Sequence, residues 1–200
     1  MTLLASVIAA YAIAILFVSV LRPPFLQQRF FIMPGPAALH LAASAIALVA
    51  GALQHNSRIR SRFLNFHRWL GRTYVLAVFL GGSAALALAK VSQAGLPTHI
   101  GFGLLAVLWL GTTGIAYRQI RARNQDSHRR WMTRSYALTF AAVTLRVYLP
   151  LSMMAGLPFD PAYQTISWLC WVPNLVIAEW LILRPERTES IRQPDSIAAA

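Results

Sequence analysis

The sequence predicts an all-α membrane protein with six transmembrane helices, and three observations support this fold class. The 200 residues are 57% hydrophobic and only 12% charged, and the mean hydropathy is +0.54. The apolar residues form six runs that approach the roughly 20 residues an α-helix needs to cross a bilayer. The charged residues lie in short clusters between these runs. A soluble domain of this size cannot bury so much apolar surface, so the composition is typical of an integral membrane protein.

The charged residues exclude several classes of function. The net charge is +12, but basic clusters between apolar runs indicate membrane topology and contact with lipid headgroups, not a nucleic-acid partner. The six carboxylates are too few to favour ion-coupled transport built on buried acid pairs. The single cysteine, Cys170, allows neither a disulfide framework nor a thiolate metal cluster.

The first predicted span covers residues 3–21 and is expected to be retained, not cleaved as a signal peptide. No basic residue precedes this run, and Arg22, Pro23 and Pro24 form a poor cleavage context. A proline-containing loop is predicted over residues 22–36.

Five further spans follow, separated by short polar or basic segments. Their predicted ranges are about 37–54, 70–89, 98–117, 131–153 and 163–183. Pro173 predicts a kink in the sixth span. Residues 1–184 are therefore expected to form the transmembrane domain. The polar residues 185–200 are expected to form a disordered cytoplasmic tail.

The basic residues predict the orientation. The segments after spans two and four hold five and six of them, whereas those after spans one, three and five hold two, one and none. Because cytoplasmic loops carry the excess of Arg and Lys, both termini are expected in the cytoplasm. The membrane would be the inner membrane of a bacterium.

The chain contains an internal repeat. Residues 68–76 read RWLGRTYVL and residues 130–138 read RWMTRSYAL, at an offset of 62. The two helical hairpins, about 37–89 and 98–153, therefore form a parallel repeat, which relates its halves by an axis along the membrane normal. Spans two to five are also rich in small residues, which predicts that they form an inner four-helix bundle.

Four histidines fall at matching depths in the two copies. His40 and His99 lie near the outer face, and His67 and His128 near the inner face. Two imidazoles from neighbouring helices are the axial ligands of a low-spin b-type haem, so these pairs predict one or two haem b sites. The alternative is that these histidines lie at the membrane interface and bind nothing. His55 has no counterpart in the second copy and is expected to be interfacial.

Three arginines are candidate anion-binding residues. Arg146 lies about 15 residues into span five, at the level of the outer histidines. A charge at that depth needs an anion or hydrogen-bond acceptors, such as a haem propionate or an acidic substrate. The alternative is that it snorkels to the outer interface. Arg72 and Arg134 could hold inner propionates as bidentate donors, and one of them is the expected partner of Glu179.

Two resemblances follow from these motifs. HRWLGRTY and HRRWMTRSYALTFAAVTLRVYLP resemble the bacterial membrane-protein family catalogued as domain of unknown function 2306, over about residues 37–153. This resemblance implies a membrane location and no established role. The pairing of spans two with four and three with five resembles six-helix di-haem b-type cytochromes, which pass electrons from ascorbate to ferric iron. That resemblance implies the four histidines above as haem ligands, although a recognisable ascorbate motif is absent.

Two functions remain open from the sequence. The first is transmembrane electron transfer through haem b, with quinone or another small redox molecule as donor or acceptor, which would make the protein an oxidoreductase. The alternative is a non-redox membrane protein, either a small-molecule or lipid carrier or a structural partner, with a polar cavity around Arg146.

Overall fold

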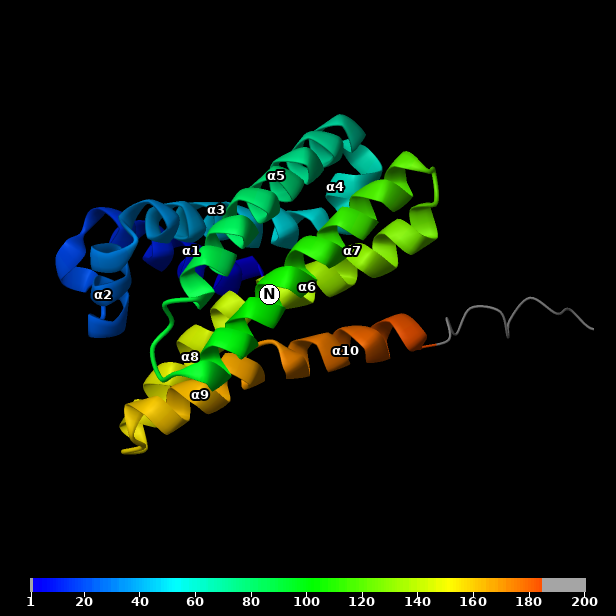
Figure 1. The fold of residues 1–200 in the computed structure, drawn as a ribbon. Coiled ribbons are helices and arrows are strands. Elements are labelled where there is room, and N and C mark those ends of the chain that lie inside the picture. The colour runs from blue at the N-terminus through cyan, green and yellow to red at the C-terminus, as the bar shows by residue number, and fades with distance from the viewer. Residues whose placement is uncertain (1, 185–200) are drawn as a thin grey trace, which may run out of the picture.

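The computed structural model describes residues 2–184, and all regular elements in this range are helices (Figure 1). They are α1 (Thr2–Phe17), η1 (Ser19–Leu21), α2 (Pro24–Ile32), α3 (Pro34–Gln54), α4 (Ser57–Arg62), α5 (Leu64–Ala89), α6 (Leu96–Arg121), α7 (Gln125–Thr139), α8 (Ala141–Met154), α9 (Phe159–Leu169) and α10 (Val172–Leu183). The all-α prediction is confirmed. The predicted tail, 185–200, lies outside the described residues.

Five helical segments are long and apolar enough to cross a membrane. They are α3, α5, α6, the pair α7 and α8, and the pair α9 and α10. Helix α1 is apolar but has only 16 residues. At 1.5 Å per residue it is about 24 Å long, shorter than a typical hydrocarbon core of roughly 30 Å. The protein is therefore a multi-pass membrane protein with five candidate spans and a shorter apolar first helix.

The long helices extend beyond the apolar runs, so the predicted basic loops were too long. Helix α5 begins at Leu64, and the turn between α6 and α7 covers only residues 122–124. Arginine is a good helix former, and a 26-residue helix such as α6 is about 39 Å long, more than the hydrocarbon core requires. The basic residues of these segments therefore lie on helical extensions.

The predicted loop over residues 22–36 contains a helix, α2. It begins at Pro24, where the fixed φ of proline suits the first helical position. It ends at Ile32, and the following residue, Met33, has a non-helical φ of −138° because the next residue is also a proline. Phe25 packs on Tyr163 of α9, with ring centroids 5.9 Å apart, which holds α2 against the helical bundle.

The sixth predicted span is broken as Pro173 suggested. Helix α9 ends at Leu169 and α10 begins at Val172. Proline lacks the N–H that would continue the helical ladder, and its ring clashes with the carbonyl four residues earlier. The prediction of a kink is confirmed.

The two repeat hairpins pack against each other through equivalent tyrosines. Tyr74 and Tyr136, 62 residues apart, are both buried. The Tyr74 hydroxyl hydrogen-bonds to Ser135 Oγ at 2.7 Å and Thr139 Oγ1 at 2.8 Å. The Tyr136 hydroxyl donates to the Leu48 carbonyl at 3.4 Å. Each tyrosine thus contacts the other hairpin, and both side chains pack in the interior between α3, α5, α6 and α7.

Gly51 lets both tyrosines approach α3, and we predict that Gly51→Ala destabilises the fold. An added Cβ would lie 2.4 Å from Tyr136 Cδ2 and 2.9 Å from Tyr74 Cε2. Forcing atoms into a packed site costs about 1–3 kcal/mol, so the Tm in detergent should fall. The matched control is Gly111→Ala on α6, where nothing lies within 4 Å of the added Cβ. An unchanged Tm for Gly51→Ala would contradict this packing.

Candidate functional site

A cavity of about 360 Å³ is lined by residues of α1, α2, α3, α5, α6, α7, α8 and α9. Most of its lining is apolar, and none of the lining residues is acidic. The side chains with a polar or ionisable group are Tyr11, Arg29, His40, Ser44, Trp109, Thr139, Arg146, Tyr163 and Cys170. The cavity therefore combines an apolar wall with two guanidinium groups.

Arg146 faces this cavity from α8. Its Nη1 donates to the Ala142 carbonyl of its own helix at 2.8 Å, which is its one hydrogen bond to the described residues. Within residues 2–184 the single salt bridge joins Arg134 and Glu179, so Arg146 has no carboxylate partner there. His40 lines the same cavity, at the outer level that the sequence predicts for Arg146.

Arg29 is a second cation in the cavity wall, and the sequence analysis did not select it. Its Nη2 donates to the Tyr163 hydroxyl at 2.8 Å. Its Nε is buried and has no hydrogen-bond partner in the described part of the chain. The guanidinium groups of Arg29 and Arg146 both lie close enough to His40 to interact with it electrostatically. The sequence signal was a lone arginine between apolar residues in FLQQRFFI.

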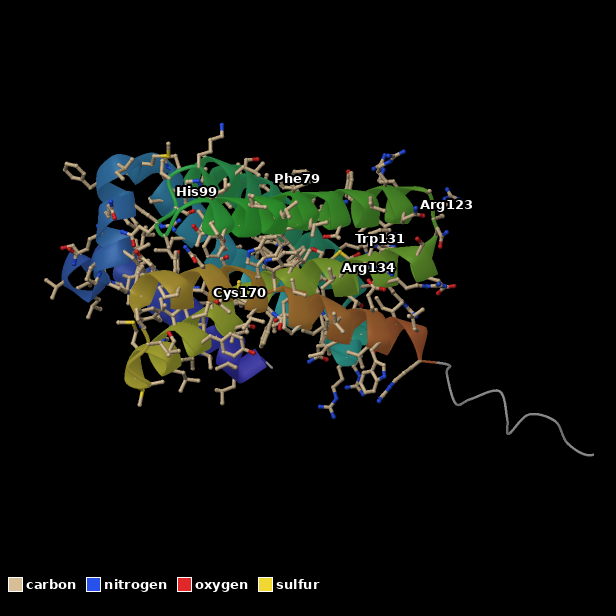
Figure 2. The ribbon with its side chains drawn as sticks, turned by 60° about the horizontal axis from the view of Figure 1, so that its bottom comes forward. Phe79, His99, Arg123, Trp131, Arg134 and Cys170 are labelled. Carbon is tan, nitrogen blue, oxygen red and sulfur yellow. The ribbon has the colours of Figure 1, made fainter. Side chains whose placement is uncertain are left out.

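The two outer histidines have different surroundings. His40 Nδ1 donates to the Gly81 carbonyl at 2.9 Å. His99 Nε2 donates to the Ser92 carbonyl at 2.8 Å, in the turn between α5 and α6. Figure 2 shows His99 near the end of α6 opposite Arg123. His99 is not among the residues that line the cavity, so this cavity does not join the two histidines.

The inner histidines also differ in their hydrogen bonds. His128 Nδ1 donates to the Ala116 carbonyl at 2.8 Å, and His67 Nδ1 is buried without a hydrogen-bond partner among the described residues. The two imidazoles interact electrostatically. His55 packs on Tyr136, with ring centroids 4.8 Å apart, so its ring contacts the bundle.

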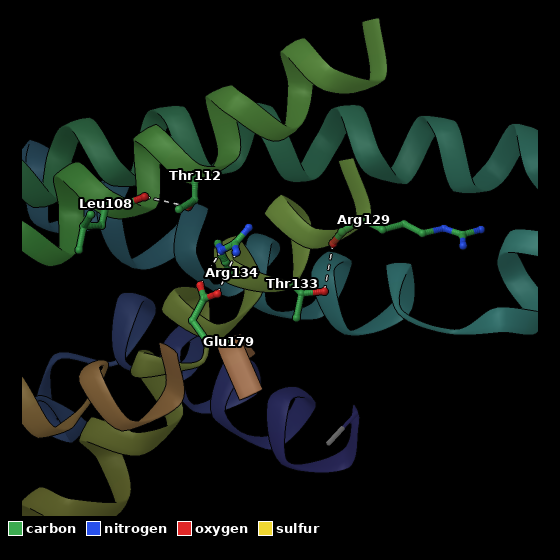
Figure 3. Close-up of polar contacts among 6 residues, drawn as sticks. All are labelled: Leu108, Thr112, Arg129, Thr133, Arg134 and Glu179. Atoms are coloured by element: carbon green, nitrogen blue, oxygen red, sulfur yellow. Dashed lines mark hydrogen bonds and ion pairs between the residues drawn. The ribbon is translucent and has the colours of Figure 1, made fainter. Parts of the chain in front are cut away.

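Arg134 is paired with Glu179, one of the two partners that the sequence analysis named (Figure 3). Arg134 Nε lies 2.5 Å from Oε1, and Nη2 lies 2.8 Å from Oε2. The guanidinium also lies over the Trp131 ring, 4.6 Å from its centroid. Arg72, its equivalent in the first repeat, is exposed. Arg134 therefore holds α10 against α7 and already has an anionic partner.

We predict a modest coupling between Arg134 and Glu179. In a double-mutant cycle with Arg134→Gln and Glu179→Gln, the coupling free energy of unfolding should be about 0.5–1 kcal/mol, because both side chains are partly exposed. Denaturant unfolding in detergent micelles measures it. Strictly additive effects of the two substitutions would show that the pair does not stabilise the fold.

A buried hydrogen-bond network adjoins the cavity through two of its residues, Trp109 and Thr139. Besides the Tyr74 bonds, Thr113 Oγ1 lies 2.6 Å from Ser135 Oγ, and Trp109 Nε1 donates to Thr139 Oγ1 at 2.8 Å. All five side chains are buried. The network carries no charge, so the charged groups of the site are those on α2 and α8.

Comparisons with known proteins agree with the membrane assignment. The family model described as "Predicted membrane protein (DUF2306)" matches residues 37–182, well over half of the chain. The chain is also 34% identical to human olfactory receptor 52W1 over 97 residues, which cover 48% of this chain and 29% of the receptor. The match thus spans less than a third of that relative's length. No solved structure matches the chain significantly. The chain belongs to the DUF2306 family of membrane proteins.

Proposed function

We propose that this member of the DUF2306 family is a membrane-embedded carrier that binds an anionic amphiphile in the cavity around Arg146. The observation that carries the proposal is a half-buried guanidinium that faces a cavity without any acidic lining residue. A charge inside the membrane costs several kcal/mol unless it is compensated. An anionic headgroup from a ligand would supply the missing charge.

The shape and lining of the cavity support an amphiphile with a single apolar part. Apolar side chains such as Leu41, Leu105 and Leu149 line the site. Its volume of about 360 Å³ lies near the lower end of the roughly 300–1,000 Å³ typical of small-molecule sites. This volume suits one apolar chain or ring system and is too small for a two-chain phospholipid.

The distribution of basic residues supports a location of this cavity in the outer half of a bacterial inner membrane. Basic residues gather on α4, on the start of α5 and around the turn between α6 and α7. The positive-inside rule assigns that end to the cytoplasm. The cavity residues His40 and Arg146 lie toward the other end of their helices. Counting α1 as a short sixth span would then bring both termini to the cytoplasmic side.

The proposal is tested by comparing charged and uncharged ligands of equal chain length. The full-length protein in phosphatidylcholine nanodiscs is titrated with dodecanoate, dodecyl phosphate and dodecanol, and Kd is measured by calorimetry. At least one anion should bind more than about tenfold tighter than the alcohol, a difference of 1.4 kcal/mol. If dodecanol binds as tightly as both anions, the proposal is wrong.

We also propose a second function, haem b binding and electron transfer at the inner pair of histidines. Its support is that His128 Nδ1 donates to a backbone carbonyl, the Ala116 oxygen, as metal-bound histidines commonly do. The buried His67 Nδ1 without a partner is a second free imidazole nitrogen nearby. In the outer pair, His40 and His99 also donate to backbone carbonyls, but only His40 lines the cavity, and haem there stays a prediction.

A haem held by His67 and His128 would supply one-electron transfer to a partner such as quinone, with Arg72 available for a propionate. The visible spectrum tests this second function. Protein purified from cells supplied with haem should show Soret and alpha bands, and His67→Ala should remove them. A spectrum without these bands in the wild-type protein would exclude the haem hypothesis.

A further inference from the structure

We infer that the cavity selects a single-chain phosphate monoester, an amphiphile whose headgroup carries two negative charges. This inference rests on the proposed function and goes beyond it by naming the headgroup. It depends on Arg29 as a specificity-determining residue in addition to Arg146.

The charge of the cavity is the first support. Arg29 on α2 and Arg146 on α8 place two guanidinium groups in its wall, and no acidic residue lines it. Arg29, Arg146 and His40 all line this one cavity. A carboxylate would compensate one of these charges. A phosphate monoester carries about −1.5 to −2 at pH 7 and would compensate both, which matters more in a low-dielectric site.

The unused hydrogen-bond donors are the second support. Arg29 Nε is buried without a partner, and an unsatisfied buried donor costs about 1–3 kcal/mol. Arg146 uses only Nη1, on a carbonyl of its own helix. Donors on α2 and α8 can therefore bind separate oxygens of one headgroup, and a phosphate monoester presents three terminal oxygens where a carboxylate presents two.

Tyr163 gives Arg29 a partner that a ligand can share. The Arg29 Nη2 bond to the Tyr163 hydroxyl at 2.8 Å is to a neutral acceptor, which is weaker than a bond to an anion. Both residues line the cavity. A phosphate oxygen can thus bind Arg29 and also accept a hydrogen bond from the Tyr163 hydroxyl, without breaking any ion pair in the protein.

The test compares headgroups that differ by one charge. Calorimetric titrations of the full-length protein in phosphatidylcholine nanodiscs use dodecyl phosphate, its methyl diester and dodecanoate. The wild-type protein should bind dodecyl phosphate about tenfold or more tighter than either monoanion. Arg29→Gln should bind all three alike. Arg129→Gln should keep the wild-type preference, because this exposed side chain does not line the cavity and extends away from Arg134 and Glu179 (Figure 3).

Each outcome separates this inference from the proposed function. If the wild-type protein binds the methyl diester or dodecanoate as tightly as dodecyl phosphate, the inference is wrong and the proposed function stands. Suppose that Arg29→Gln melts as the wild type does and still binds dodecyl phosphate more tightly than the methyl diester and dodecanoate. The inference then also fails. If no anion binds tighter than dodecanol, the proposed function itself fails.

Discussion

Replacing Arg146 with glutamine is expected to weaken the binding of an anionic amphiphile by at least about 100-fold. Removing one partner of a buried, hydrogen-bonded charge pair costs about 2–5 kcal/mol, and 100-fold corresponds to about 2.7 kcal/mol. Calorimetric titration with dodecyl phosphate measures the loss. The Tm of the ligand-free variant should not fall, because Arg146 makes a single hydrogen bond, to its own helix, among the described residues.

Two control variants distinguish a binding role from a structural one. Arg146→Lys keeps the charge but lacks the planar fork of donors, so its Kd should lie between those of the wild type and Arg146→Gln. Arg129→Gln removes an exposed arginine and should bind as the wild type does. Wild-type affinity for Arg146→Gln would show that Arg146 does not contact the ligand.

Replacing Tyr74 with alanine is expected to cause the largest loss of stability. The side chain is 0% exposed and its hydroxyl bonds both Ser135 and Thr139. Truncating a large buried aromatic residue costs about 3–5 kcal/mol, and the two hydroxyl partners also lose a bond. Tyr74→Phe should cost less, about 1–3 kcal/mol, since it removes the hydroxyl and keeps the ring.

Thermal and denaturant unfolding in detergent measure both Tyr74 variants. Tyr117→Ala is the matched control, because Tyr117 on α6 is 45% exposed; its Tm should change little. A Tyr74→Ala protein that melts like the wild type would show that the repeats do not depend on this contact.

The helical fold and the repeat were predictable because both follow from patterns along the chain. Apolar runs give the spans, and the RWLGRTYVL and RWMTRSYAL copies give equivalent tyrosines that meet between the hairpins. The helix ends were less predictable, since Arg continues a helix as readily as it forms a loop. Helix α2 was missed because its flanking prolines suggested a loop, although Pro24 in fact begins the helix.

Residue counting predicted which side chains share a level along the helices, but not which way each side chain faces. Counting residues placed Arg146 at the level of His40, and both line one cavity. The same counting placed His99 at that level, yet its imidazole bonds Ser92 in the turn before α6. The direction a side chain faces depends on how helices pack, which residue spacing does not determine. Arg29 was missed for a related reason, because its role depends on α2 packing beside α9.

The most direct test of the account is native mass spectrometry of the full-length protein released from nanodiscs. We predict that the wild-type chain carries one anionic single-chain amphiphile acquired from the expressing cell, and that Arg146→Gln lacks it. The Arg129→Gln control should carry it as the wild type does. If the wild-type protein and Arg146→Gln carry the same molecules in the same amounts, the cavity around Arg146 is not an anion-binding site.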